Sequence, residues 1–180
     1  MSENIILSGV SGVGQDYVMQ KMYESGLDFK NINLGELISE EIKNNPSLSA
    51  EENINNAFEK VRREILKERG KKVLNVYNIY GDNPSQMNSN QDRIEKLPID
   101  KSIVIEAKPD TIVKRREQDI MSRPNRAKNT IEEIDKIQKE STKIAKDIAD
   151  HKDIPFKIFY NDDNLNIKDI VDFINRDSKD

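Results

Sequence analysis

The sequence predicts a three-layer α/β fold, in which helices cover both faces of a five-stranded parallel sheet. Short apolar segments alternate with longer segments of helical periodicity, which is the pattern of parallel strands joined by helical crossovers. The first apolar segment runs directly into the glycine-rich stretch 9–14, which places a candidate ligand loop at the carboxyl end of a buried strand. A length of 180 residues suits one domain, so we expect residues 1–180 to form a single unit.

Five short segments have the composition of strands. Each carries Ile, Leu, Val, Phe or Tyr over a length that is typical of a strand and too short for an independent helix. The first, Ile-Ile-Leu, is continuously apolar, as expected for a strand that is buried on both faces. In chain order, the predicted strands cover residues 5–7, 29–33, 72–80, 102–107 and 154–160.

Six segments have helical periodicity, and several carry recognisable ends. Gly26 stops the first helix, and Pro109 suits the first turn of the fourth. The third begins with the capping box formed by Ser49 and Glu52 and ends at Gly70. In chain order, the predicted helices cover residues 15–25, 36–43, 50–69, 109–118, 130–150 and 167–174.

Two polar segments show neither the composition of a strand nor the periodicity of a helix. Residues 81–92 predict a loop with almost nothing to bury, because they hold Asn, Asp, Ser, Gln, Gly and Pro almost throughout. Residues 119–128 predict a short basic loop.

Composition excludes several classes of function. The sequence has no cysteine and one histidine, which excludes disulfides, thiolate zinc sites and cysteine nucleophiles. A net charge of −4 provides no global basic field for nucleic acid or anionic lipid. The chain holds neither the roughly 20 apolar residues that span a bilayer nor a signal-peptide pattern. We therefore expect a cytoplasmic protein with no membrane partner.

The glycine-rich stretch GVSGVG at residues 9–14 matches the spacing of a phosphate-binding loop and then departs from it. In the pattern G-x-x-x-x-G-K-[ST], backbone N–H groups cradle phosphates, the Lys reaches the β- and γ-phosphates, and the hydroxyl binds Mg²⁺. Here Gln15 stands at the Lys position and Asp16 at the Ser or Thr position. The candidate nucleotide-binding residues are Gly9, Val10, Ser11, Gly12, Val13, Gly14, Gln15 and Asp16.

The first departure replaces a cation with a neutral amide and the second replaces a neutral hydroxyl with an anion, so the local charge at the phosphates falls by about two units. One charge at about 4 Å is worth roughly 4 kcal/mol at an effective dielectric constant near 20. Losing a donor aimed at transition-state charge lowers the rate by about 10²–10³. Mg²⁺ bound to Asp16 would offset that carboxylate, but nothing nearby in the sequence replaces the Lys. The alternative is that residues 9–14 form only a tight structural turn.

Four motifs, the first of which contains the glycine-rich stretch, occur in an order that carries a resemblance over most of the chain. They are ILSGVSGVG at residues 6–14, NINLGE at 31–36, IEAKP at 105–109 and TIEEI at 130–134. Together with an Arg-rich segment at 115–128, they resemble the archaeal-type adenylate kinases, which are small P-loop nucleoside monophosphate kinases. The resemblance implies a P-loop kinase-like fold.

The resemblance also implies ligands and site residues. ATP and AMP would be the nucleotides, with Gly35 and Glu36 on the nucleoside monophosphate side. The segment 115–128 would be a short lid whose Arg115, Arg123 and Arg126 contact phosphates during transfer. Two alternatives for this segment stay open: a solvated basic helix end, or a nucleic-acid patch, although no aromatic residues are interleaved to stack on bases.

The chain departs from the family in residues that carry charge or bind metal. The family's Asp at the end of the third strand, which helps to hold Mg²⁺, is replaced here by Asn75 or, if the alignment slips, by Asn78. The lid Arg expected before Asp119 is Gln118. The glycine-proline substrate segment that usually follows strand three is also missing. We therefore expect a poor Mg²⁺ site.

Three hypotheses follow. The leading one is an adenylate-kinase-like protein that binds a nucleotide but whose phosphoryl transfer is impaired or lost, leaving a regulator or scaffold. The second is an active nucleoside monophosphate kinase with a variant loop, converting ATP and AMP to ADP. The third is an interaction protein in ribosome or RNA assembly, because a nuclear branch of the family has that link. The family often forms homo-oligomers, and the sequence does not indicate which helix face would be used.

Overall fold

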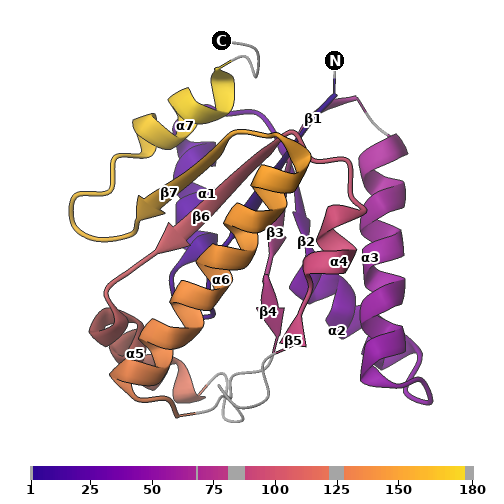
Figure 1. The fold of residues 1–180 in the computed structure, drawn as a ribbon, viewed down its shortest axis with the longest axis horizontal. Coiled ribbons are helices and arrows are strands. Elements are labelled where there is room, and N and C mark those ends of the chain that lie inside the picture. The colour runs from indigo at the N-terminus through magenta and orange to yellow at the C-terminus, as the bar shows by residue number, and fades with distance from the viewer. Residues whose placement is uncertain (1, 68, 81–87, 122–127, 177–180) are drawn as a thin grey trace.

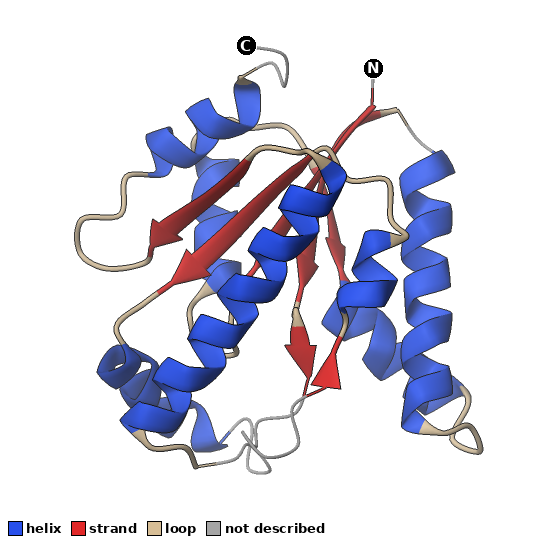
Figure 2. Cartoon of the chain, in the orientation of Figure 1, coloured by secondary structure: helices blue, strands red, loops and turns tan. Residues whose placement is uncertain are grey.

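A computed structural model of the protein describes residues 2–67, 69–80, 88–121 and 128–176. It confirms the predicted α/β class: a five-stranded, all-parallel sheet in the order β2-β3-β1-β6-β7, with helices on both faces (Figures 1 and 2). The crossovers place β1 at the centre of the sheet. The strands are β1 (Ser2–Ser8), β2 (Lys30–Asn33), β3 (Gly70–Val76), β6 (Lys101–Glu106) and β7 (Phe156–Tyr160).

The helices form the two outer layers. In Figure 1, α6 crosses the near face of the sheet beside α4 and α3, whereas α1 and α7 lie behind it. A two-stranded antiparallel sheet, β4 (Ile79–Tyr80) with β5 (Asn88–Ser89), extends from the end of β3. The helices are α1 (Gln15–Glu24), α2 (Leu34–Asn44), α3 (Ala50–Lys67), α4 (Gln91–Glu95), α5 (Pro109–Gln118), α6 (Ile131–Lys152) and α7 (Ile167–Asn175), with a short 3₁₀ helix, η1 (Asp119–Met121).

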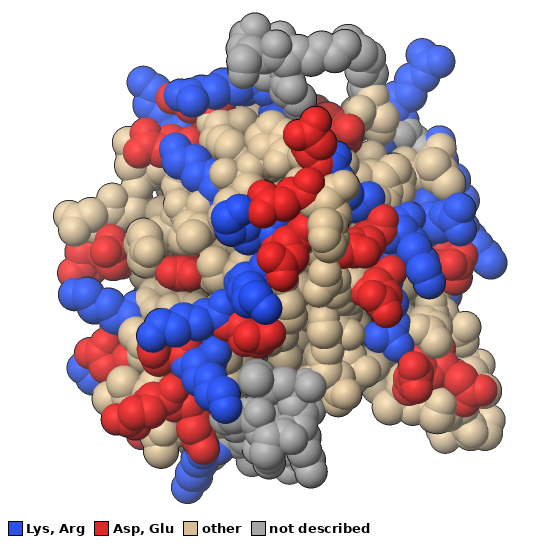
Figure 3. Space-filling view, in the orientation of Figure 1, with Lys and Arg blue, Asp and Glu red and all other residues tan. Residues whose placement is uncertain are grey.

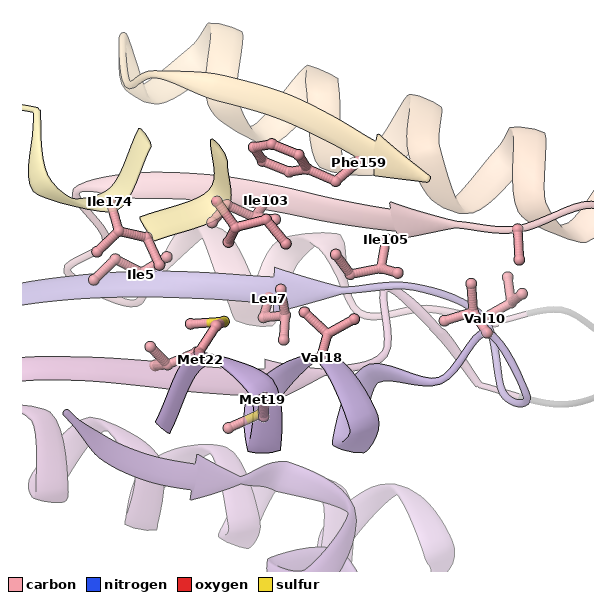
Figure 4. Close-up of a cluster of buried hydrophobic side chains, with 14 of the residues drawn as sticks. Ile5, Leu7, Val10, Val18, Met19, Met22, Ile103, Ile105, Phe159 and Ile174 are labelled. Carbon is pink, nitrogen blue, oxygen red and sulfur yellow. The ribbon is translucent and has the colours of Figure 1, made fainter. Parts of the chain in front are cut away.

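The strand residues alternate between two hydrophobic cores, as the two-residue period of a strand requires. Ile5 and Leu7 of β1 pack with α1 and α7, whereas Ile6 between them belongs to the core under α3 and α6. Figure 4 shows the first core, in which Leu7 lies close to Val18 of α1 and Ile105 of β6. Because β1 is buried on both faces, it holds the loop that follows it in a rigid setting.

The helix ends that the sequence predicts are present. The Ser49 hydroxyl accepts a hydrogen bond from the Glu52 N–H at 3.2 Å, and the Glu52 carboxylate accepts one from the Ser49 N–H at 2.8 Å. Thr130 and Glu133 form the same reciprocal capping box at the start of α6. Gly26 has a φ of +86° just after α1, in the left-handed region where a helix commonly ends on glycine.

The polar segment 81–92 is where the fold prediction is wrong. Residues 88–89 form β5 and α4 begins at Gln91, while residues 81–87 lie outside the described part. The buried Asn90 ties this region to the end of the predicted third strand: its side-chain amide donates to the Tyr77 carbonyl at 2.9 Å. That strand is also interrupted, since β3 ends at Val76 and β4 begins at Ile79. The basic loop predicted from residue 119 starts instead with η1.

Surface charge is mixed. Figure 3 shows basic and acidic side chains interspersed over the face that carries α6 and α3, in keeping with the small net charge of −4. None of the helices in the described ranges is long and apolar enough to cross a membrane.

An almost fully buried carboxylate joins α2 to α3. The Glu41 side chain forms an ion pair with Lys60 and accepts a hydrogen bond from the Asn45 side chain at 3.0 Å. The hydrogen bond from Lys60 lowers the pKa of the Glu41 carboxyl below its ordinary value of 4.5. A carboxyl whose pKa is lowered by folding stabilises the folded state above its unfolded pKa, and that stabilisation is lost as the pH falls through the folded pKa.

We expect Glu41→Gln to lower the melting temperature at pH 7, and the difference from the parent to shrink as the pH falls below 4.5. Thermal unfolding followed by circular dichroism from pH 3 to pH 7 measures this. The matched control is Glu51→Gln, which removes an exposed carboxylate that pairs with Arg93 and should change little. A Glu41→Gln deficit that is constant with pH would contradict the assignment.

Candidate functional site

A cleft of about 780 Å³ opens at the carboxyl end of the sheet, beside the start of α1. This is the edge at which parallel α/β sheets bind ligands, because the loops that follow the strands converge there. The cleft is lined by Gly12, Gly14, Gln15, Asp16, Tyr17, Tyr77, Lys108, Thr111, Arg115, Gln118, Asp119, Asn161, Asp162, Asp163 and Leu165.

The loop between β1 and α1 has three glycines at positions where another residue would clash or be strained. A Cβ on Gly9 would lie 2.7 Å from the Ile105 carbonyl oxygen, inside van der Waals contact. Gly12 and Gly14 have φ values of +91° and +92°, where other residues are strained. A Cβ on Gly14 would also lie 2.4 Å from the side-chain nitrogen of Asn161. The glycines that define the sequence motif therefore have steric reasons to be there.

The other loop residues contribute through their backbone. Val10 and Val13 were predicted to bind nucleotide, but their side chains are buried in the core, so only their peptide groups are available to a ligand. The Val13 N–H donates to the Val10 carbonyl at 3.1 Å, which closes a tight turn within the loop. Ser11 turns its carbonyl to Arg116 of α5.

Gln15 occupies the Lys position of the motif, and its side chain is directed into the protein. Its amide nitrogen lies 3.2 Å from the Leu7 carbonyl oxygen at the end of β1, 3.0 Å from the Asn75 side-chain oxygen and 3.2 Å from the Val76 carbonyl oxygen. Only 5% of the residue is exposed. The two N–H bonds of this amide are therefore shared among three oxygens beneath the loop.

Asn75 is the strand-three residue that lies next to the loop. Its side-chain oxygen accepts from Gln15, and its side-chain nitrogen donates to the Asp16 carboxylate at 3.1 Å. Asn78 points elsewhere: its amide nitrogen contacts Ser8 and Ser141. Of the two candidates from the sequence, Asn75 therefore lies beside the loop and Asn78 does not. Gln15, Asn75 and Asp16 form one continuous hydrogen-bonded chain.

Three side chains from other elements hold the carbonyls of the loop. Arg115 donates to the Val13 carbonyl at 2.9 Å and Asn161 donates to the same oxygen at 2.8 Å. Arg116 donates to the Ser11 carbonyl at 2.9 Å. The sequence pointed to Arg115 but missed Arg116 and Asn161, because a second Arg in a basic run and an Asn after a strand carry no distinguishing local signal.

Arg123 and Arg126, the other two residues predicted to be catalytic, lie outside the described residues. Their role stays a prediction.

A second pocket of about 620 Å³ adjoins the first. Both are lined by Asp16 and Tyr77, so these two residues stand at the boundary between the pockets. Gly35 and Glu36, expected on the nucleoside monophosphate side, lie here at the start of α2. The full lining is Asp16, Asn33, Gly35, Glu36, Ser39, Glu40 and Tyr77.

Carboxylates outnumber cations among the described residues that line the two pockets. A carboxylate at about 6 Å from a bound anion opposes it by roughly 3 kcal/mol at an effective dielectric constant near 20. The favourable groups are the loop amides and the start of α1, where no side chain caps the first N–H groups. The carboxylates are Asp16, Glu36, Glu40, Asp119, Asp162 and Asp163, and the cations are Lys108 and Arg115.

Mg²⁺ has little support from this donor set. Within the described ranges, no group of three or more His, Asp or Glu side chains is placed to hold a metal ion. Asp16 is the residue that stands where the motif's hydroxyl ligand would be, and its carboxylate already accepts from Asn75. A metal at this loop would therefore depend on Asp16 and on the phosphates of the ligand itself.

Comparison with known proteins identifies a family and a fold. A sequence model of the family described as "AAA domain" matches residues 8–135, which include the loop, both pockets' central residues and α5. None of the curated proteins matches the chain.

Several kinases are among the solved structures that resemble this chain. Shikimate kinase from Acinetobacter baumannii, in complex with shikimate, superposes with a TM-score of 0.59 at 14% identity, covering 97% of this chain and 93% of that one. Shikimate kinase from Bacteroides thetaiotaomicron gives 0.51 at 16% identity, covering 96% and 94%. A gluconokinase from Sinorhizobium meliloti gives 0.52 at 11% identity, covering 96% and 89%. At these identities the likeness establishes the fold, that of the P-loop kinases.

We expect Gln15→Ala to lower the free energy of unfolding by about 1–3 kcal/mol, because it leaves buried acceptors on two strands without their donor. Urea denaturation measures the change. Gln20→Ala is the control on the same helix, since that side chain is exposed and bonds only Glu24 in an i, i+4 pair; it should stay within about 0.5 kcal/mol of the parent. Equal effects of the two variants would contradict a structural role for Gln15.

Proposed function

The chain belongs to the AAA domain family, and from this premise we propose that it is a nucleotide-binding protein of P-loop kinase fold whose phosphoryl-transfer activity is impaired or lost. The observation that carries the proposal is the Gln15 side chain. It stands where the family's Lys would reach the β- and γ-phosphates, yet it is neutral, buried and bonded to Leu7, Asn75 and Val76.

The loss of catalysis follows from charge. Removing one donor aimed at transition-state charge lowers the rate by about 10²–10³, and here the Lys cation is replaced by an amide that is already occupied. Asp16 adds an anion beside the position of the transferred phosphoryl group, and Asn75 is neutral where an acidic residue would help to hold Mg²⁺. The three changed residues lie in one hydrogen-bonded chain beside the loop.

The groups that would bind a nucleotide are not altered by the changes at Gln15, Asp16 and Asn75. The glycine positions keep their left-handed backbone, and the N–H groups at the start of α1 have no side-chain cap. A helix N-terminus after a glycine loop suits a phosphate. The cleft volume, about 780 Å³, falls within the range of roughly 300–1,000 Å³ typical of small-molecule sites. We propose the phosphates of a nucleoside triphosphate such as ATP as the group bound there.

The second pocket argues against AMP as a phosphate acceptor. Asp16, Glu36 and Glu40 surround it, and no Lys or Arg is among its described lining residues. The phosphate dianion of AMP would meet repulsion there. Although the sequence resembles adenylate kinases, we therefore do not propose that this protein transfers a phosphoryl group from ATP to AMP.

We expect the purified protein to show adenylate kinase turnover several orders of magnitude below the ordinary enzyme range of about 1–10³ s⁻¹. A coupled assay with ATP, AMP and Mg²⁺ measures it, and calorimetric titration of the same sample with ATP, with and without Mg²⁺, measures binding. Turnover within the ordinary range would overturn the proposal and favour an active kinase with a variant loop. So would a tightening of ATP binding by Mg²⁺ of more than about a hundredfold, roughly 2.7 kcal/mol.

The double variant Gln15→Lys/Asp16→Thr should raise ATP affinity by at least about tenfold, because it returns a cation and a hydroxyl to the loop. Calorimetry on the variant and the parent measures the gain, and circular dichroism confirms folding. Gln20→Lys is the control for the added Lys: it places one positive charge on the exposed side of α1 and should leave affinity unchanged. No gain in a folded double variant would mean that the cleft does not bind the nucleotide.

A further inference from the structure

The phosphate loop is held from outside by its carbonyl groups. The Ser11 oxygen accepts from the Arg116 side chain at 2.9 Å. The Val13 oxygen accepts from the Asn161 side chain at 2.8 Å and from Arg115 at 2.9 Å. These donors come from α5 and from the residue that follows β7, so two elements distant in sequence converge on alternate peptide groups of one short loop.

Fixing a carbonyl also fixes the amide on the other side of the same peptide. In a planar trans peptide the C=O and the following N–H point in opposite directions, and no cis peptide bond occurs in the described chain. Holding the Ser11 and Val13 oxygens therefore turns the N–H groups of Gly12 and Gly14 away from Arg116 and Asn161. Both glycines line the cleft.

Arg116 is buried and contacts the loop, and it is not among the residues that line the cleft. It is only 7% exposed. Its guanidinium joins the Ser11 carbonyl to the Asn129 side chain, which accepts at 2.6 Å. Asn129 in turn donates to Glu133 in the capping box of α6. The planar guanidinium of Arg has N–H donors in fixed directions and can hold two acceptors at once, which the ammonium of Lys cannot do in the same geometry.

Asn161 also holds the loop, and unlike Arg116 it lines the cleft. It is 4% exposed, and its own N–H donates to the Glu106 carbonyl at 2.7 Å, which anchors it to the end of β6. Its side-chain nitrogen occupies the space that a Cβ on Gly14 would need. The pairing of this Asn with a glycine is thus a steric fit as well as a hydrogen bond.

We propose that Arg116 and Asn161 are positioning residues that orient the amides of Gly12 and Gly14 toward a phosphate-type anion in the cleft. Arg116 acts through the Ser11–Gly12 peptide, and Asn161 acts through the Val13–Gly14 peptide. The inference rests on the proposed function for the identity of the site, and it explains how a loop without its Lys would still bind phosphate: through backbone donors set in place by Arg116 and Asn161.

The test is a titration of the ¹⁵N-labelled full-length protein with inorganic tripolyphosphate, followed by the amide signals of Gly12 and Gly14. In the parent both signals should shift with saturation. Arg116→Met, which keeps the aliphatic stem, should weaken binding by at least about fivefold and diminish the Gly12 response while Gly14 still responds. Asn161→Ala should do the reverse. Arg62→Met, which removes an exposed guanidinium on α3, should change neither.

Two further outcomes keep the proposal falsifiable. Arg116→Lys separates orientation from charge: affinity should stay reduced, and full recovery would show that only the positive field matters and would overturn the proposal. General destabilisation would weaken both glycine responses together in either variant, which would also overturn it. Thermal unfolding of each variant confirms that the protein titrated is folded.

The proposed function fails by a different readout. Kinase turnover in the ordinary range would contradict the proposed loss of catalysis. It would not affect the positioning roles, which are tested by the separate effects of Arg116→Met on the Gly12 signal and of Asn161→Ala on the Gly14 signal. A parent protein that binds ATP in the calorimeter but shows no Gly12 or Gly14 response to tripolyphosphate would overturn the positioning roles alone.

Discussion

The Gln15 side-chain amide is the interaction on which the rest of the site depends. It reaches the carbonyls of Leu7 in β1 and Val76 at the end of β3 and the Asn75 side chain at once, so it joins the first turn of α1 to the central strand and its neighbour. Because the loop runs from β1 to α1, this one amide sets the distance between its two ends. A neutral donor suits such a buried position, since an unpaired buried charge is costly.

Donors that a kinase would aim at phosphate are used here inside the protein. The Gln15 amide bonds strand oxygens, and Arg115 and Arg116 bond loop carbonyls. The described surface that remains for a ligand combines backbone N–H groups and two cations, Lys108 and Arg115, with a larger number of carboxylates. Such a site favours recognition through fixed dipoles over stabilisation of a highly charged transition state. The same hydrogen bonds that hold the loop thus occupy the side chains of Gln15, Arg115 and Arg116.

The fold could be predicted because its signals are local. The apolar run of β1, the capping box at Ser49 and the glycine after α1 each act within a few residues of themselves. The prediction was wrong for residues 88–92, where β5 and the start of α4 depend on Asn90 bonding the main chain at Tyr77 and Asn78. A polar Asn in a polar run resembles a loop residue until its distant partner is known.

The sequence by itself determined the α/β class, the position of the ligand edge and the glycine loop with its two altered side chains. Only the tertiary structure decided what those side chains do. Gln15 meets Val76 across 61 positions, Arg116 meets Ser11 across 105, and Asn161 meets Val13 across 148. The physical reason is that periodicity and steric demand act along the chain, whereas hydrogen-bond partners are brought together by the packing of separate strands and helices.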